Sequence, residues 1–302
     1  MTIFRRVENK PVFTTRFTLR VSWCLGITAF LSAVGLCITS TTINIPSLII
    51  PLVSSLVMFG LAVLYRRRDP VISDLCQSVG WMVLISNLFN LPMFAIARLK
   101  PPFQDATLVA IDQWFRIEIP DILALQSRFP ISFTIINSSY NLLLPLIMLA
   151  IVLPTACGQG KQVREFFIAL MMSGVIGFSL FYLFPAAGWF DHYHATPRPE
   201  HRAYLDTIRN VWDQETFEID MGYRAGLIYF PSFHTILPIL SLFSLRRIPF
   251  GLLCATPIAV LIILSTMTTG HHYPCDIYAG IFVALVSWWI ASKVEPHLSG
   301  EV

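Results

Sequence analysis

The sequence predicts an all-α membrane protein, a bundle of about eight transmembrane helices. Hydrophobic residues make up 55% of the chain and charged residues only 13%, about half the charged share of an ordinary globular domain. The uncharged runs also reach about 20 residues, the length that a helix needs to cross a bilayer. A soluble all-α protein of this size would need far more charge to cover its surface.

The predicted spans follow one another from residue 20 to residue 292. The first comes after a basic arm without a small-residue cleavage site, which favours a retained helix over a signal peptide. The third is long enough to tilt or to run into the membrane interface. The eight spans are 20–38, 46–65, 71–97, 131–154, 165–184, 228–245, 250–269 and 274–292.

Two segments between the spans are more than connectors. Segment 101–130 carries Leu108, Ile111 and further apolar residues at near-helical spacing among charged residues, which predicts a helix or broken helix in the plane of the interface. Segment 186–226 is rich in aromatic and charged residues and has an amphipathic stretch at 200–217. A loop of this length is either a solvated loop with a surface helix or a cap over an active site, and the sequence leaves both open.

The distribution of lysine and arginine predicts the orientation of the bundle. With the N-terminus inside, 13 of the 21 basic residues fall on the inner side. Both termini are therefore expected in the cytoplasm, and the loops that begin the sixth and eighth spans are expected outside, in a bacterial inner membrane. The basic clusters are explained by orientation and weak attraction to anionic lipids, so the net charge of +3 predicts no nucleic-acid partner. The oligomeric state is left open.

Two motifs place histidines where an apolar run meets a polar loop. The first reads Pro231-Ser232-Phe233-His234-Thr235. Proline favours the first helical turn, and free backbone N–H groups beside Ser232 are expected to form an anion site at the positive end of the helix dipole. His234 lies in the same turn, where its ring is able to donate a proton to a bound anion. An ionisable residue at a membrane boundary is a functional candidate.

The second motif reads His271-His272-Tyr273-Pro274-Cys275-Asp276. Asp276 stands four residues after His272, the spacing at which side chains meet on a helix. Such a pair fixes the histidine tautomer and leaves the other ring nitrogen free for nucleophilic attack on phosphorus. His271 is expected to assist substrate binding and not to be the nucleophile. Because the sixth and eighth spans start on the same side, adjacent packing would bring His234 and His272 to one cavity.

The remaining candidates predict no metal and no cofactor. The six cysteines show neither an evident pair nor a CxxC motif. His192, His194 and His201 lack the regular spacing of metal ligands, which favours solvated loop histidines.

The spacing of the two motifs resembles the type-2 phosphatidic acid phosphatase superfamily of membrane lipid phosphatases and phosphotransferases. Pro-Ser-x-His is followed, 38 residues after its histidine, by His-x-x-x-Asp. The resemblance covers about residues 71–292 and implies a six-helix core. It divides the chain into residues 1–70, a cytoplasmic arm with two added helices, and residues 71–302, a catalytic membrane domain.

The resemblance also implies the roles of four residues. His272 is the implied nucleophile that becomes phosphorylated, and Asp276 is its acidic partner. His234 is the implied proton donor to the leaving group, and Ser232 the implied phosphate-binding serine. The family uses no metal.

Two cations of the family pattern are absent from this chain. Thr266 stands where the third motif has arginine, and Asp191 stands where the first motif has lysine. We expect Arg198 and Arg224 to bind phosphate in their place. Similar erosion with a doubled histidine resembles the inositol phosphorylceramide synthases, which implies transfer of a phospho-head group to an alcohol or lipid acceptor.

Two alternatives remain open at this point. One is plain hydrolysis of a lipid phosphate or polyprenyl pyrophosphate. The other is a transporter-like or structural membrane protein whose site is inactive.

Overall fold

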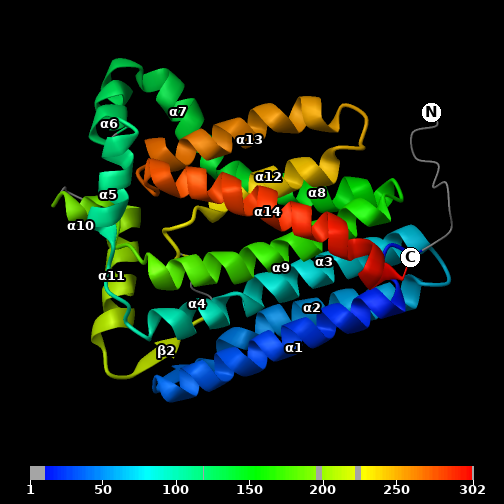
Figure 1. The fold of residues 1–302 in the computed structure, drawn as a ribbon. Coiled ribbons are helices and arrows are strands. Elements are labelled where there is room, and N and C mark those ends of the chain that lie inside the picture. The colour runs from blue at the N-terminus through cyan, green and yellow to red at the C-terminus, as the bar shows by residue number, and fades with distance from the viewer. Residues whose placement is uncertain (1–10, 118, 195–198, 222–225, 301–302) are drawn as a thin grey trace.

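The structure of the protein, a computed structural model, describes residues 11–117, 119–194, 199–221 and 226–300. Seven helical segments in these ranges are long and apolar enough to cross a membrane, so the predicted all-α membrane fold is confirmed. They lie side by side in Figure 1. They are α1 (Thr15–Ile38), α2 (Ile45–Tyr65), α3 with α4 (Pro70–Leu88 and Asn90–Ala97), α7 with α8 (Pro130–Ser139 and Leu143–Ala156), α9 (Gly160–Leu183), α13 (Gly251–Thr268) and α14 (Pro274–Ser299).

The sixth predicted span, 228–245, is present as a shorter helix than expected. Helix α12 (Phe233–Leu245) has 13 residues, about 20 Å at 1.5 Å per residue. The prediction placed its start five residues too early because Pro231 keeps the residue before it out of the helical region. Helix α12 packs against α8, α9, α13 and α14. Because other helices surround it, it does not need the full length of a lipid-exposed span.

Side-chain caps set the starts of the N-terminal helices. The hydroxyl of Thr14 accepts the N–H of Phe17 at 3.1 Å, and a carboxylate oxygen of Asp69 accepts the N–H of Val71 at 2.9 Å. Such caps satisfy donors that a helix start leaves unpaired. Helix α1 therefore begins at Thr15, directly after its cap and five residues before the predicted residue 20.

Short helices run across one end of the bundle (Figure 1). Segment 101–130 forms two of them, and segment 186–226 forms two more with one short strand. The strand β2 (Phe217–Ile219) pairs in parallel with β1 (Thr41–Ile43), which joins the α1–α2 connection to this end. How these segments lie in a bilayer stays a prediction. The four short helices are α5 (Asp105–Trp114), α6 (Ile119–Arg128), α10 (Trp189–His192) and α11 (Pro199–Asp213).

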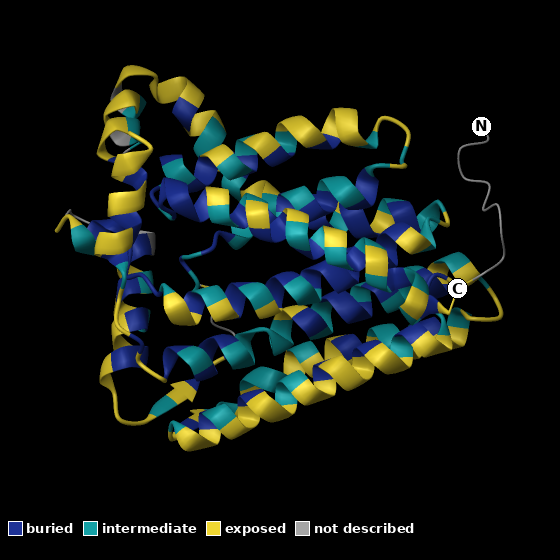
Figure 2. Ribbon diagram, in the orientation of Figure 1, coloured by how far each residue is buried: buried dark blue, intermediate teal, exposed yellow. Residues whose placement is uncertain are grey.

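Buried ion pairs hold the other end, where α1 begins and α14 ends (Figure 1). Arg164 Nε of α9 lies 2.6 Å from Glu295 Oε1 of α14, and both side chains are almost fully buried. Arg246 pairs with Glu165 in the same region. Charges buried in this way need partners, so these pairs fix the register of α9, α12 and α14. Figure 2 shows buried residues concentrated on the helices between the two ends.

Candidate active site

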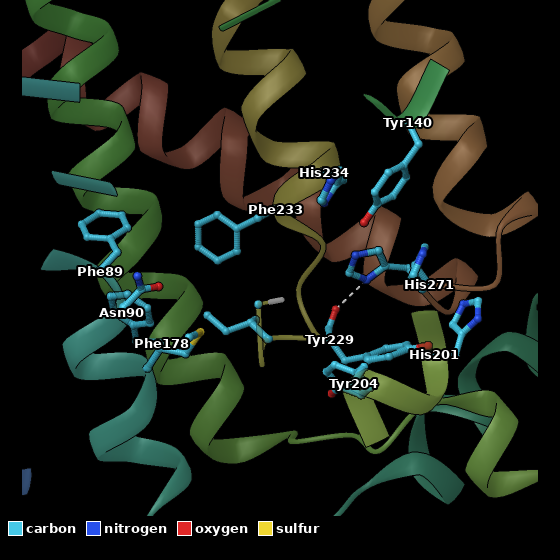
Figure 3. Close-up of a pocket in the computed structure, with 14 residues that line it drawn as sticks. Phe89, Asn90, Tyr140, Phe178, His201, Tyr204, Tyr229, Phe233, His234 and His271 are labelled. Atoms are coloured by element: carbon cyan, nitrogen blue, oxygen red, sulfur yellow. Dashed lines mark hydrogen bonds between the residues drawn. The ribbon is translucent and has the colours of Figure 1, made fainter. Parts of the chain in front are cut away.

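A cavity of about 230 Å³ opens where α12 begins. Figure 3 shows its two unlike sides: Phe89, Asn90 and Phe178 lie on one side and the labelled histidines on the other. Phe233 lies between them. The histidines that line the cavity are His201, His234, His271 and His272. One cavity therefore combines an imidazole-rich wall with an aromatic wall, which suits a ligand with a polar and an apolar part.

His272 is held by its Nδ1 atom. This nitrogen lies 2.8 Å from the carbonyl oxygen of Tyr229, the bond drawn as a dashed line in Figure 3. A carbonyl oxygen only accepts, so Nδ1 carries the proton and donates it. In the neutral ring the lone pair is then on Nε2, the nitrogen available for attack on an electrophile.

Asp276 lies on the same side of the His272 ring. Its Oδ2 atom is 3.2 Å from His272 Nδ1 and accepts the N–H of Tyr273 at 2.7 Å. The Tyr273 bond fixes the carboxylate in the first turn of α14, so it lies where it would stabilise a positive charge on the His272 ring. Asp276 is fully buried and does not line the cavity.

Burial also sets the protonation state of His272. It lowers the pKa of His272 to about 4, against the opposing effect of the Tyr229 carbonyl bond. The ring is therefore neutral near pH 7, with its Nε2 lone pair unprotonated.

His234 lines the cavity together with His272. Their ring centroids are 6.2 Å apart, and the His234 ring stacks on Tyr140 with centroids 4.2 Å apart. The bundle thus brings the two motif histidines together from α12 and from the α13–α14 connection. A group bound between the rings would therefore contact both imidazoles.

Ser232 occupies a different place from the one predicted. Its backbone N–H donates to the carbonyl oxygen of Asp276 at 3.1 Å, so this amide is not free to bind an anion. Its side chain is fully buried, and it does not line the cavity. Among the described residues its hydroxyl has no hydrogen-bond partner. The α12 start is able to lie close to α14 because Gly280 has no side chain: a Cβ there would lie only 2.9 Å from the Ser232 carbonyl oxygen.

The two predicted phosphate-binding cations, Arg198 and Arg224, lie outside the described residues. Positions 266 and 191, where the sequence lacks the two expected cations, make other contacts in the structure. Thr266 is fully buried, and its carbonyl oxygen accepts the N–H groups of His271 (3.1 Å) and His272 (3.2 Å). Asp191 pairs with Arg209 at 2.5 Å, with both side chains partly exposed.

The prediction that His201 is a solvated loop histidine is wrong. Its side chain is only 3% exposed and lines the cavity from α11, with its ring centroid 4.3 Å from that of His271. A signal was present, since His201, Tyr204 and Ile208 recur at helical spacing and so share one face. Because Tyr204 also lines the cavity, α11 covers part of the site.

His271, predicted to assist substrate binding, also lines the cavity. Its ring lies between those of His201 and Tyr140, with its centroid 5.0 Å from that of Tyr140. Tyr140 and Tyr229 also line the cavity, and the sequence did not predict either of them as a site residue. Tyr229 acts through its main-chain carbonyl, which every residue type has, so no residue pattern would have indicated it.

The fold and the cavity together describe an all-α membrane protein with a histidine-lined cavity at the start of α12. The family model of the PAP2 superfamily, the type-2 phosphatidic acid phosphatases, matches residues 106–290. This is more than half of the chain, so the protein belongs to the PAP2 superfamily, which indicates a phosphatase-type lipid phosphoesterase. No curated protein and no solved structure matched the chain in the same comparisons.

Proposed function

We propose that the protein transfers a phospho-head group from a membrane lipid to an alcohol or lipid acceptor through a phosphohistidine intermediate on His272. The observation that carries the proposal is the bond of His272 Nδ1 to the Tyr229 carbonyl oxygen, 2.8 Å long. It leaves Nε2 as the nucleophile in a cavity that His234 shares.

The reaction has two steps. In the first, the anionic phosphate binds beside His234 and favours protonation of its ring. His272 Nε2 then bonds to phosphorus, and the bond from phosphorus to the leaving oxygen breaks while the His234 imidazolium protonates that oxygen. In the second, the acceptor hydroxyl gives its proton to His234 and attacks phosphorus, and the P–N bond to His272 breaks. Asp276 stabilises the positive charge on the phosphorylated ring, and Arg198 and Arg224 are the proposed phosphate-binding cations.

Two observations support transfer over hydrolysis. The cavity wall contributed by Phe89, Phe178 and Phe233 is apolar, and α11 covers the site with His201 and Tyr204. A shielded phosphohistidine is protected from bulk water and survives long enough to meet an alcohol. The likeness of the motifs to inositol phosphorylceramide synthases points the same way.

The partition of the intermediate tests this proposal. We expect purified protein with a head-group-labelled phospholipid to form a new phosphodiester whose yield rises with the concentration of a diacylglycerol, ceramide or polyol acceptor. Chromatography of the labelled products measures both outcomes. Release of the labelled head-group phosphate at the same rate with and without acceptor, and no new phosphodiester, would leave a plain lipid phosphatase.

We also propose that the site faces the outside of a bacterial inner membrane. The start of α1 lies close to the end of α14, since Thr14 Oγ1 donates to the Ser299 carbonyl oxygen at 3.3 Å. The start of α12, which borders the cavity, lies away from this end of the bundle (Figure 1). The basic residues at the end where α1 begins support a cytoplasmic position for that end of the bundle.

Cysteine labelling tests this orientation. In a variant with its six native cysteines changed to serine, we expect an impermeant maleimide to label Thr216→Cys, an exposed position beside β2, on intact cells. Pro249→Cys, exposed at the other end of the bundle, is expected to react only after permeabilisation. The reverse pattern would place the site in the cytoplasm.

A further inference from the structure

Two acidic residues of α5 contact the segment that carries His272. Asp105 and Asp112 are seven residues apart, so they lie on the same face of this helix. Both are buried, with 8% and 3% of their surface exposed. Buried carboxylates are rare unless they are well bonded, and α5 lies across one end of the bundle (Figure 1), where it contacts α14.

Asp105 joins two segments that are far apart in the sequence. Its Oδ2 atom accepts the N–H of Ala187 at 3.0 Å, and its Oδ1 atom accepts the N–H of Gly188 at 2.8 Å. The same Oδ1 accepts the hydroxyl of Tyr273 at 2.9 Å. Tyr273 follows His272 directly, so Asp105 holds the residue next to the nucleophile.

Asp112 bonds to the same segment at Cys275, two residues after Tyr273. Its Oδ1 atom accepts the N–H of Cys275 at 2.7 Å. Cys275 is in the first turn of α14, where backbone N–H groups have no partner within the helix. The two carboxylates therefore hold the residues on both sides of Pro274: Asp105 bonds to the side-chain hydroxyl of Tyr273, and Asp112 bonds to the backbone N–H of Cys275.

The bonds of Asp105 also reach the other end of the segment. Gly188 precedes Trp189, whose indole N–H donates to the carbonyl oxygen of Gly270 at 3.1 Å. Gly270 has a φ of +80°, and a Cβ there would lie 2.6 Å from the Trp189 indole nitrogen. The segment 270–276 is thus fixed at its start through Trp189 and at its end through Asp112.

We infer that Asp105 and Asp112 are positioning residues that hold His272 Nε2 in line for attack on phosphorus. This inference rests on the proposed function. A carboxylate at 105 accepts three hydrogen bonds, and an asparagine has only one accepting oxygen for these donors. Asp105→Asn therefore releases at least one of the two joined segments while the side chain keeps its size.

The test separates the rate of phosphorylation from the fraction of protein able to react. Purified variants are mixed with ³²P-labelled dioctanoyl phosphatidylinositol, a donor that carries a phospho-head group, and quenched at short times, which gives the rate constant and the amplitude of phosphohistidine formation. We expect Asp105→Asn to lower the rate constant about 100-fold, as a small misplacement of reacting atoms does, with unchanged amplitude and less than a threefold change in KM. Tyr273→Phe, which removes one of the three bonds, is expected to lower it about 10-fold.

A matched pair at position 112 and an outside control complete the test. Asp112→Ala is expected to slow phosphorylation, and Asp112→Asn, which keeps an oxygen for the Cys275 N–H, to recover most of the loss. Asp121→Asn changes an exposed acid of α6 and is expected to match the wild type.

Two results would overturn the inference alone: an Asp105→Asn rate constant equal to that of the wild type, or a lower amplitude with an unchanged rate constant. The second result indicates partial unfolding. Absence of phosphohistidine in the wild type would overturn the proposed function, and this inference with it.

Discussion

His272→Ala is expected to abolish turnover, with a loss on the order of 10⁶-fold, as follows removal of a catalytic nucleophile. Alanine has no nitrogen to bond to phosphorus, and the neighbouring imidazole of His271 has a different environment, between His201 and Tyr140. Product formation from a labelled phospholipid measures the loss.

Two further histidine variants make this experiment specific. His271→Ala is expected to slow turnover but still to become phosphorylated at His272. His234→Ala is expected to lose turnover with lipid alcohols but to form phosphohistidine from a donor with a good leaving group, which needs no proton. Acid-labile phosphate mapped to His271 by mass spectrometry would contradict the assignment of the nucleophile.

Asp276→Asn is expected to slow phosphorylation of His272 on the order of 10³-fold, the effect of removing a preorganised electrostatic stabiliser. In a serine-protease triad the same change costs about 10⁴-fold because it also selects the wrong tautomer. Here the Tyr229 carbonyl, 2.8 Å from Nδ1, keeps the tautomer, so only the stabilisation of positive charge is lost.

Rapid-quench measurement of phosphohistidine formation checks this value. Ser287→Ala, a buried change further along the same helix, controls for damage to α14 and is expected to keep the wild-type rate. An Asp276→Asn rate within tenfold of the wild type would show that the Tyr229 carbonyl alone orients and stabilises His272.

Much of the fold followed from the sequence because a bilayer imposes simple rules. Uncharged runs of span length predict helices, and seven of the eight predicted spans correspond to membrane-length helical segments. The error at 228–245 has a local cause, since Pro231 delays the start of α12 to Phe233. The breaks at Phe89 and at Tyr140–Leu142 were not predicted, because hydropathy does not distinguish one long helix from two short ones.

The candidate site was predictable only in part. The motif spacing named His234, His272 and Asp276, and these lie in or beside one cavity. It did not indicate that the Ser232 amide bonds to the Asp276 carbonyl, or that His201 faces the cavity. Both depend on how separate helices pack.

By itself, the sequence determined the membrane fold class, the approximate spans and the motif residues, because hydropathy and spacing are properties of residue types along the chain. Tertiary structure alone decided that the carbonyl of Tyr229 bonds to His272 Nδ1, that Asp105 bonds to the Tyr273 hydroxyl, and that Asp112 bonds to the Cys275 N–H. These contacts join residues 43 to 168 positions apart, and several use main-chain atoms that are common to all residues. Only the packing of α5, α12 and α14 brings such atoms within hydrogen-bond distance.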